Sequence, residues 1–74
     1  MLQQTRVEAV KGYYRRFLDS LPVTERRVFL LRYWYLESVD SIASKFGFSQ
    51  SKVKSMLYRT RSRLRQQLEK EELL

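Results

Sequence analysis

The scarcity of helix-breaking residues is the feature that most constrains this sequence. Its 74 residues include only two glycines and one proline. Apolar residues recur at steps of three and four along almost the whole chain, which is the spacing of amphipathic helices rather than of strands. We therefore predict an all-α fold, a small four-helix domain over residues 1–74, with helices at about 4–19, 24–35, 39–46 and 50–70.

Capping residues indicate where these helices begin and end. Pro22 disfavours helical geometry in the residue before it and so separates the first helix from the second. Thr24 is the expected N-cap of the second helix, and Ser38 is a candidate N-cap of the third. Gly47 directly follows the third helix, where a residue with positive φ is often needed.

The positive charge is concentrated in the last predicted helix. The whole chain carries a net charge of +7, which favours an anionic partner such as nucleic acid or an acidic membrane surface. Residues 50–65 contain no acid and six cations: Lys52, Lys54, Arg59, Arg61, Arg63 and Arg65. Such a run is the electrostatic footprint expected of phosphate binding, although a merely solvated basic helix is the plainer alternative.

At about 100° per residue the last helix separates into two faces. The expected buried seam consists of Val53, Leu57, Thr60 and Leu64. Opposite it lie Ser51, Ser55, Tyr58 and Ser62, with Lys54, Arg59 and Arg65 on the flanks. Short serines let a helix approach a surface closely, and the flanking cations can then reach phosphates on either side of a groove.

Residues 38–53 have the form of a helix-turn-helix. Ala43 is small enough to let two helices cross closely, and Gly47 permits a tight turn between them. In this motif the second helix enters the major groove, and its N-terminal residues meet the base edges. The expected base contacts are Gln50, Ser51, Lys54 and Ser55, while backbone amides near Ser38 and Ser49 are natural phosphate donors. A generic helical hairpin is the alternative.

Several classes of function are disfavoured. The chain has no cysteine and no histidine, which removes thiolate metal sites and the commonest general base. We expect no enzymatic activity and no cofactor or metal. The longest apolar run, Val28 to Leu31, is far short of the roughly 20 residues that a membrane-spanning helix needs. Because each predicted helix has an apolar face that the others can bury, a membrane partner is not expected either.

An ordered set of short motifs resembles a known family. The motifs are Leu21-Pro22, Glu25-Arg26, Val28-Phe29-Leu30-Leu31-Arg32-Tyr33, Ile42-Ala43, Gly47, Val53-Lys54-Ser55, Leu57, Arg59, Arg61 and Leu64-Arg65. Together they are similar to region 4 of sigma-70-type RNA polymerase sigma factors, especially the compact extracytoplasmic-function group. The similarity covers about residues 17–66.

The resemblance implies a cytoplasmic bacterial domain that recognises the minus-35 promoter element while attached to RNA polymerase. By position, the recognition-helix contacts fall on Gln50, Ser51, Lys52, Lys54, Ser55, Tyr58 and Arg59. It also implies a second surface, formed by Val28, Leu31, Tyr35 and their neighbours, for the β-subunit flap of the polymerase core or for an anti-sigma factor. We expect a C-terminal fragment of a longer factor; a natural short protein is the alternative.

Several positions depart from the family pattern, among them Leu36 and Ser41. Leu36 stands where the family usually has glycine, so the turn before Ser38 is expected to be built differently. Ser41 replaces the usual acid, which removes the carboxylate that would complete a capping box. The cluster Tyr33-Trp34-Tyr35 is broader than one apolar stripe needs, and we expect part of it to face a partner protein.

Two other functions remain open from the sequence. One is a DNA-binding domain of the response-regulator type, which shares the Ile-Ala and Val-Lys signals but dimerises through a separate last helix. The other is an interaction domain that is bound mainly by an anti-sigma factor. If the domain reads promoter DNA, replacing Lys54 should reduce discrimination between sequences, and replacing Arg63 should weaken binding about uniformly.

Overall fold

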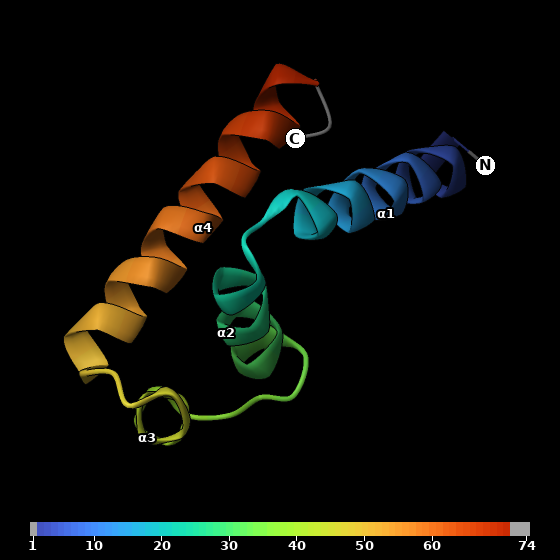
Figure 1. Cartoon of the computed structure of the whole chain (residues 1–74). Helices are drawn as coiled ribbons and strands as arrows, with labels where there is room; N and C mark the ends of the chain where they lie inside the picture. The colour runs from blue at the N-terminus through green and yellow to red at the C-terminus, as the bar shows by residue number, and fades with distance from the viewer. Residues whose placement is uncertain (1, 72–74) are drawn as a thin grey trace.

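The computed structural model describes the backbone of residues 2–71 and the side chains of residues 8–71. It contains four helices: α1 (Leu2–Ser20), α2 (Val23–Tyr33), α3 (Val39–Phe46) and α4 (Gln50–Lys70). Within residues 2–71 there is no strand, which confirms the all-α four-helix prediction. Residue 1 and residues 72–74 of the predicted domain lie outside the described residues. The long α4 packs against each of the other three helices (Figure 1).

The core lies where α2 and α3 pack on the first half of α4. Ile42 of α3 and Val53 of α4 are 0% exposed, and Val28 of α2 is 1% exposed. They belong to one cluster with Phe29, Ala43, Met56 and Leu57. Thr60 is buried and Leu64 packs against the cluster, as the predicted seam of α4 requires. None of the four helices described has the combination of length and apolar character that crossing a bilayer demands.

The start of α2 differs from the prediction. Pro22 is the N-cap, with φ −54° and ψ 148°, and its carbonyl accepts a 3.0 Å hydrogen bond from the amide of Arg26. Thr24 lies inside the first turn, so its assignment as the cap was wrong. The proline ring fixes φ near a value that suits entry into a helix, and the proline carbonyl can accept the first helical bond without a capping side chain. No side-chain cap is present at this end.

The end of α2 comes two residues before the predicted position 35. The amides of Trp34 and Tyr35 both donate to the carbonyl of Leu30, at 2.8 and 3.1 Å. Leu36 then adopts φ 58°, and the amide of Glu37 donates to the carbonyl of Leu31 at 2.9 Å. Leu36 thus takes the left-handed conformation for which glycine is the usual residue at a helix end. The turn before Ser38 therefore has glycine-type geometry at Leu36 without a glycine.

The turn between α3 and α4 follows the capping signals. The Ser38 hydroxyl accepts a 3.1 Å hydrogen bond from the amide of Ser41, and the Ser49 hydroxyl accepts one of 3.1 Å from the amide of Lys52. Gly47 has φ 69°, and the next amide, that of Phe48, donates to the carbonyl of Ala43 at 2.9 Å. These contacts confirm the predicted roles of Ser38 and Gly47, and they set the first turn of α4 beside α3.

Candidate nucleic-acid interface

The residues predicted to contact DNA all reach the surface. Ser38 is the N-cap of α3, Ser49 is the N-cap of α4, and the others lie on the first three turns of α4. All nine are exposed: Ser38, Ser49, Gln50, Ser51, Lys52, Lys54, Ser55, Tyr58 and Arg59. The opposite side of the same turns is buried through Val53, Met56 and Leu57. The first half of α4 therefore presents a polar, basic face, which we call the outer face.

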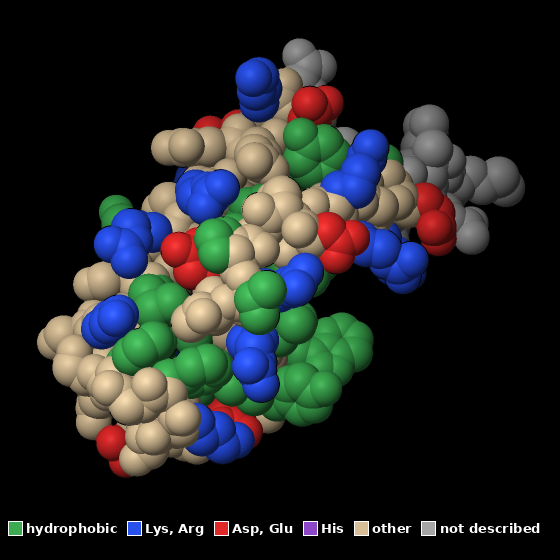
Figure 2. All heavy atoms as spheres, in the orientation of Figure 1, with side chains coloured by type: hydrophobic (Ala, Val, Ile, Leu, Met, Phe, Trp, Pro, Cys, Tyr) green, Lys and Arg blue, Asp and Glu red, His purple; other side chains and the backbone are tan. Residues whose placement is uncertain are grey.

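A shallow basic hollow lies on the outer face. Its lining residues are Lys54, Ser55, Tyr58, Arg59 and Arg61, and its volume is about 570 Å³. Three of the five carry positive charge and none is acidic. Tyr58 is 65% exposed, so its hydroxyl and ring are open to a ligand. Lys and Arg side chains recur along the length of α4 (Figure 2). The hollow suits an anionic surface that presents both phosphates and flat apolar groups.

Lys52 lies on a flank of the outer face. Its ammonium nitrogen is 4.0 Å from the centre of the Phe48 ring, and that ring stacks on Phe46 at 5.6 Å between centroids. A cation above an aromatic face at an exposed site is stabilised by about 0.5–1 kcal/mol. This contact ties Lys52 to the turn between α3 and α4 and leaves its charge exposed there.

The cations further along α4 are engaged within the domain. Arg61 donates a hydrogen bond to the hydroxyl of Tyr33 on α2. Arg63 forms an ion pair with Glu25 at 3.8 Å, and Arg65 forms one with Glu69 at 3.0 Å. Among the side chains described, Lys54 and Arg59 form no ion pair of this kind. Ion pairs thus offset the charges of Arg63 and Arg65, whereas Lys54 and Arg59 on the outer face keep theirs.

One polar contact at this site was not predicted from the sequence. The Nε2 atom of Gln50 donates a 3.0 Å hydrogen bond to Oδ1 of Asp40. Asp40 lies in the first turn of α3, and Gln50 is the first residue of α4. The contact therefore joins the starting turns of the two helices of the motif. An acid ten positions before the first residue of the recognition helix was the only signal in the sequence.

Glu37 organises the neighbouring turn between α2 and α3. Its carboxylate accepts hydrogen bonds from Lys45 and from the Ser41 hydroxyl, the second at 3.2 Å. The hydrogen bond from Lys45 is the main cause that holds the pKa of Glu37 below its ordinary value of 4.5. The Arg32 guanidinium donates to the Glu37 carbonyl at 3.2 Å. Side chains from α2 and α3 therefore hold the turn that leads to Ser38.

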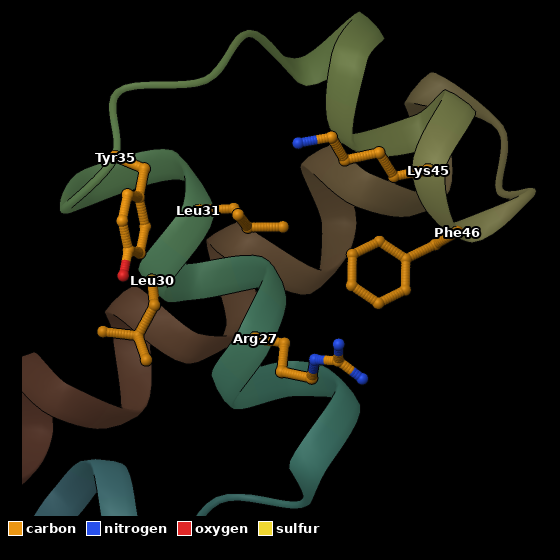
Figure 3. Close-up of a pocket in the computed structure, with 6 residues that line it drawn as sticks. All are labelled: Arg27, Leu30, Leu31, Tyr35, Lys45 and Phe46. Atoms are coloured by element: carbon orange, nitrogen blue, oxygen red, sulfur yellow. The ribbon is translucent and has the colours of Figure 1, made fainter.

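A second surface lies beside the end of α2. A hollow of about 490 Å³ is lined by Arg27, Leu30, Leu31, Tyr35, Lys45 and Phe46. Leu31 of α2 and Phe46 of α3 point into the space between the two helices, and Arg27 lies beside Phe46 (Figure 3). Of the predicted partner contacts, Leu31 and Tyr35 line this hollow. Val28 does not, because it is 1% exposed and belongs to the core, so that part of the prediction is wrong.

The hollow continues into a wider groove between α1 and α2. The groove has a volume of about 720 Å³ and is lined by Lys11, Tyr14, Arg15, Leu18, Asp19, Arg26, Leu30, Trp34 and Tyr35. Trp34 is 73% exposed and Tyr35 is 66% exposed, whereas Tyr33 is less exposed at 40%. Apolar side chains stand out from the surface near the end of α2 (Figure 2). We call this surface, with the adjoining hollow, the α2 groove.

A short helix, a left-handed glycine turn and a long helix with a basic outer face define a helix-turn-helix domain of the DNA-binding class. Comparison with known proteins identifies the family of this domain. The family model described as "Sigma-70, region 4" matches residues 11–64, and the chain belongs to this family. The family is nonenzymatic, and its members are sigma factor domains that typically bind minus-35 promoter DNA.

The chain is also similar to an RNA polymerase sigma-E factor of Streptomyces avermitilis. The two are 35% identical over 69 residues, which cover 93% of this chain and 38% of that relative. The chain thus spans well under half the length of the curated relative it matches. No solved structure matches the chain significantly.

Proposed function

We propose that this chain binds the minus-35 promoter element through the outer face of α4 and so directs transcription initiation as region 4 of a sigma factor. The observation that carries the proposal is the division of α4. Val53, Met56 and Leu57 are buried in the core, while the nine predicted contact residues are exposed. A helix of this kind fits the major groove with its N-terminal turns against the base edges.

The side chains divide into two groups by chemistry. Gln50, Ser51, Lys54 and Ser55 carry donors and acceptors suited to base edges, and lysine in particular donates to the acceptors of guanine. Lys52 and Arg59 carry charge on a flank, where phosphates lie beside the groove. The first amides of α3 and α4, next to Ser38 and Ser49, lie at the positive ends of the two helices and suit phosphate oxygens.

The α2 groove is the proposed contact with the RNA polymerase core, through its β-subunit flap. It combines exposed Trp34 and Tyr35 with a rim that includes Lys11, Arg15 and Arg26. Such a surface suits an amphipathic helix with an apolar face and acidic flanks. An anti-sigma factor that covers the same groove would compete with the polymerase, and this is the second candidate role of the domain.

The continuity of α4 bears on the response-regulator alternative. α4 runs unbroken from Gln50 to Lys70, so no separate dimerisation helix follows the recognition helix within residues 2–71. The helices of this chain therefore favour the sigma-type arrangement.

A salt series on selected DNA tests the proposal. Duplexes with a randomised core are selected on the chain, and the affinity of the enriched sequence is measured at several salt concentrations. We expect weak, selective binding with a steep salt dependence, because phosphate contacts release counterions. A pool without enrichment, or an affinity that does not change with salt, contradicts the proposal.

Two arginines of α4 provide a matched pair for the same measurement. Arg59→Ala should weaken binding to all sequences and reduce the slope of log affinity against log salt by about one. Arg63 lies about 20 Å along the helix from Gln50 and is paired with Glu25, so Arg63→Ala should have the smaller effect. The uniform weakening that the sequence predicts for Arg63 is therefore expected to be small. Equal effects of the two substitutions would contradict the assigned orientation of α4.

A further inference from the structure

The hydrogen bond between Asp40 and Gln50 links a residue with no proposed contact to DNA to one that is expected to read a base. Gln50 Nε2 and Asp40 Oδ1 are 3.0 Å apart, and both residues are exposed. Gln50 occupies the first position of α4, and Asp40 lies in the first turn of α3, two residues after its Ser38 cap. Among the side chains described, Asp40 forms no ion pair, so no cation competes with Gln50 for its carboxylate.

The chemistry of the two groups makes this contact directional. A glutamine amide has a donor end and an acceptor end of nearly equal shape, and either end can point outward when the side chain is unrestrained. An ionised carboxylate accepts hydrogen bonds and cannot donate them. Only the NH₂ end of Gln50 can therefore face Asp40, which fixes the direction of the amide. The acceptor Oε1 and the second N–H remain for a ligand.

We propose that Asp40 is a positioning residue that sets the amide of Gln50 to read adenine. The inference rests on the proposed function. In the major groove adenine offers the N7 acceptor beside the N6 donor, and an amide that presents one donor and one acceptor complements this pair. Asp40 thereby acts on sequence choice without touching the base.

The same carboxylate has a second effect of opposite sign. It adds a negative charge at the start of the motif, close to where phosphates would lie, and so lowers the affinity for every sequence. Asp40 should therefore increase discrimination while decreasing general affinity. A residue that merely favours the positive end of α3 would not influence discrimination.

Selection from a randomised duplex pool with the wild type and four variants tests the inference. The position read by Gln50 is the one whose base preference disappears in Gln50→Ala. At that position Asp40→Ala should reduce the preference for adenine by about 3- to 10-fold, part of the tenfold or more that a bidentate pair supplies. Asp40→Asn carries both a donor and an acceptor, so it no longer fixes the direction of the Gln50 amide and should also reduce the preference, though by less than Asp40→Ala. In the Gln50→Ala background, Asp40→Ala should change no preference.

General affinity is the second readout. Asp40→Ala and Asp40→Asn should both bind a duplex of unrelated sequence more tightly, by about 2- to 3-fold at low salt. Asp19→Ala adds the same net charge at the end of α1 and should produce a smaller increase. Circular dichroism checks that each variant keeps its helical content. In the free chain, the side-chain amide resonances of Gln50 should shift in Asp40→Ala and stay in place in Asp19→Ala.

The outcomes separate the two proposals. If the wild-type pool is not enriched, the proposed function fails, and this inference fails with it. If the pool is enriched but Asp40→Ala raises affinity at every position without changing the adenine preference, only the inference fails. It also fails if the preference removed by Gln50→Ala is for a base other than adenine, or if the amide resonances of Gln50 ignore Asp40.

Discussion

Leu36 and Gly47 hold nearly the same left-handed backbone conformation, with φ 58° and φ 69°, in the two turns that bracket α3. Glycine adopts this conformation without a steric penalty, whereas a residue with a Cβ is strained there. The Leu36 side chain is 77% exposed, so packing within the domain does little to offset the strain. The two turns therefore require the same left-handed conformation, which glycine provides in one turn and leucine in the other.

Leu36→Gly should stabilise the domain. Removing the strain contributes about 1–2 kcal/mol, and the greater flexibility of glycine in the unfolded chain costs about 0.5–1 kcal/mol. The expected net gain is about 0.5–1 kcal/mol in the free energy of unfolding, or a few degrees in Tm. Leu36→Ala keeps the strained Cβ and should change stability by less than about 0.5 kcal/mol. Thermal and urea unfolding measure both; a Gly variant no more stable than the Ala variant contradicts the assignment.

Gly47→Ala should have the opposite effect. A Cβ built at Gly47 meets no atom within 4 Å, so the substitution introduces backbone strain and no clash. We expect a loss of about 0.5–1.5 kcal/mol, which is the left-handed penalty reduced by the smaller entropy of the unfolded alanine chain. Gly12→Ala, inside α1, also meets no atom within 4 Å and should be stabilising instead. Urea unfolding compares the Gly47→Ala and Gly12→Ala variants. Equal changes in their free energy of unfolding would argue against strain at Gly47.

The acid sensitivity of the α2–α3 turn should depend on Lys45. The hydrogen bond from Lys45 lowers the pKa of Glu37 from its ordinary 4.5, so the charged carboxylate is favoured in the folded state. Its contribution to stability is present above about pH 4.5 and is lost as the pH falls through the folded-state pKa. Lys45→Ala should raise the pKa of Glu37 towards 4.5, as measured by NMR titration of the carboxyl carbon. Lys54→Ala serves as the control and should leave this pKa unchanged.

Two exposed aromatic residues should separate the polymerase contact from the DNA contact. Trp34 is 73% exposed in the α2 groove, and Tyr58 is 65% exposed in the basic hollow of α4. Trp34→Ala should weaken binding to core RNA polymerase by about tenfold or more, as expected for an aromatic residue that becomes buried in an interface. It should leave DNA binding unchanged. Tyr58→Ala should do the reverse. A loss of both activities in either variant would indicate a folding defect, which circular dichroism detects.

Both ends of α3 and the start of α4 could be predicted because capping residues mark them in the sequence. Ser38, Gly47 and Ser49 have side-chain or backbone preferences that act locally, and the observed helices begin and end beside them. The end of α2 could not be read in this way. Leu36 adopts a glycine-type conformation without being glycine, so no residue marks the turn.

Burial and side-chain pairing were harder to predict than helix position. The apolar stripe of α2 shows which side of that helix is apolar, but it does not distinguish a core residue such as Val28 from a groove residue such as Leu31. That distinction depends on where α3 and α4 cross α2. The contact between Asp40 and Gln50 depends likewise on the angle between two helices, which local sequence preferences do not set.

The hydrogen bond and the ion pair that connect α2 and α4 have a geometric consequence. Arg61 bonds to Tyr33 near one end of α2, and Arg63 pairs with Glu25 near the other, over a shared buried core. The helix with the outer face and the helix with the apolar groove are therefore joined by side-chain contacts and by a shared core. If DNA and polymerase occupy these two surfaces, the fold sets the distance between the bound minus-35 element and the polymerase. A change in the spacing between promoter elements must then be accommodated elsewhere in the assembly.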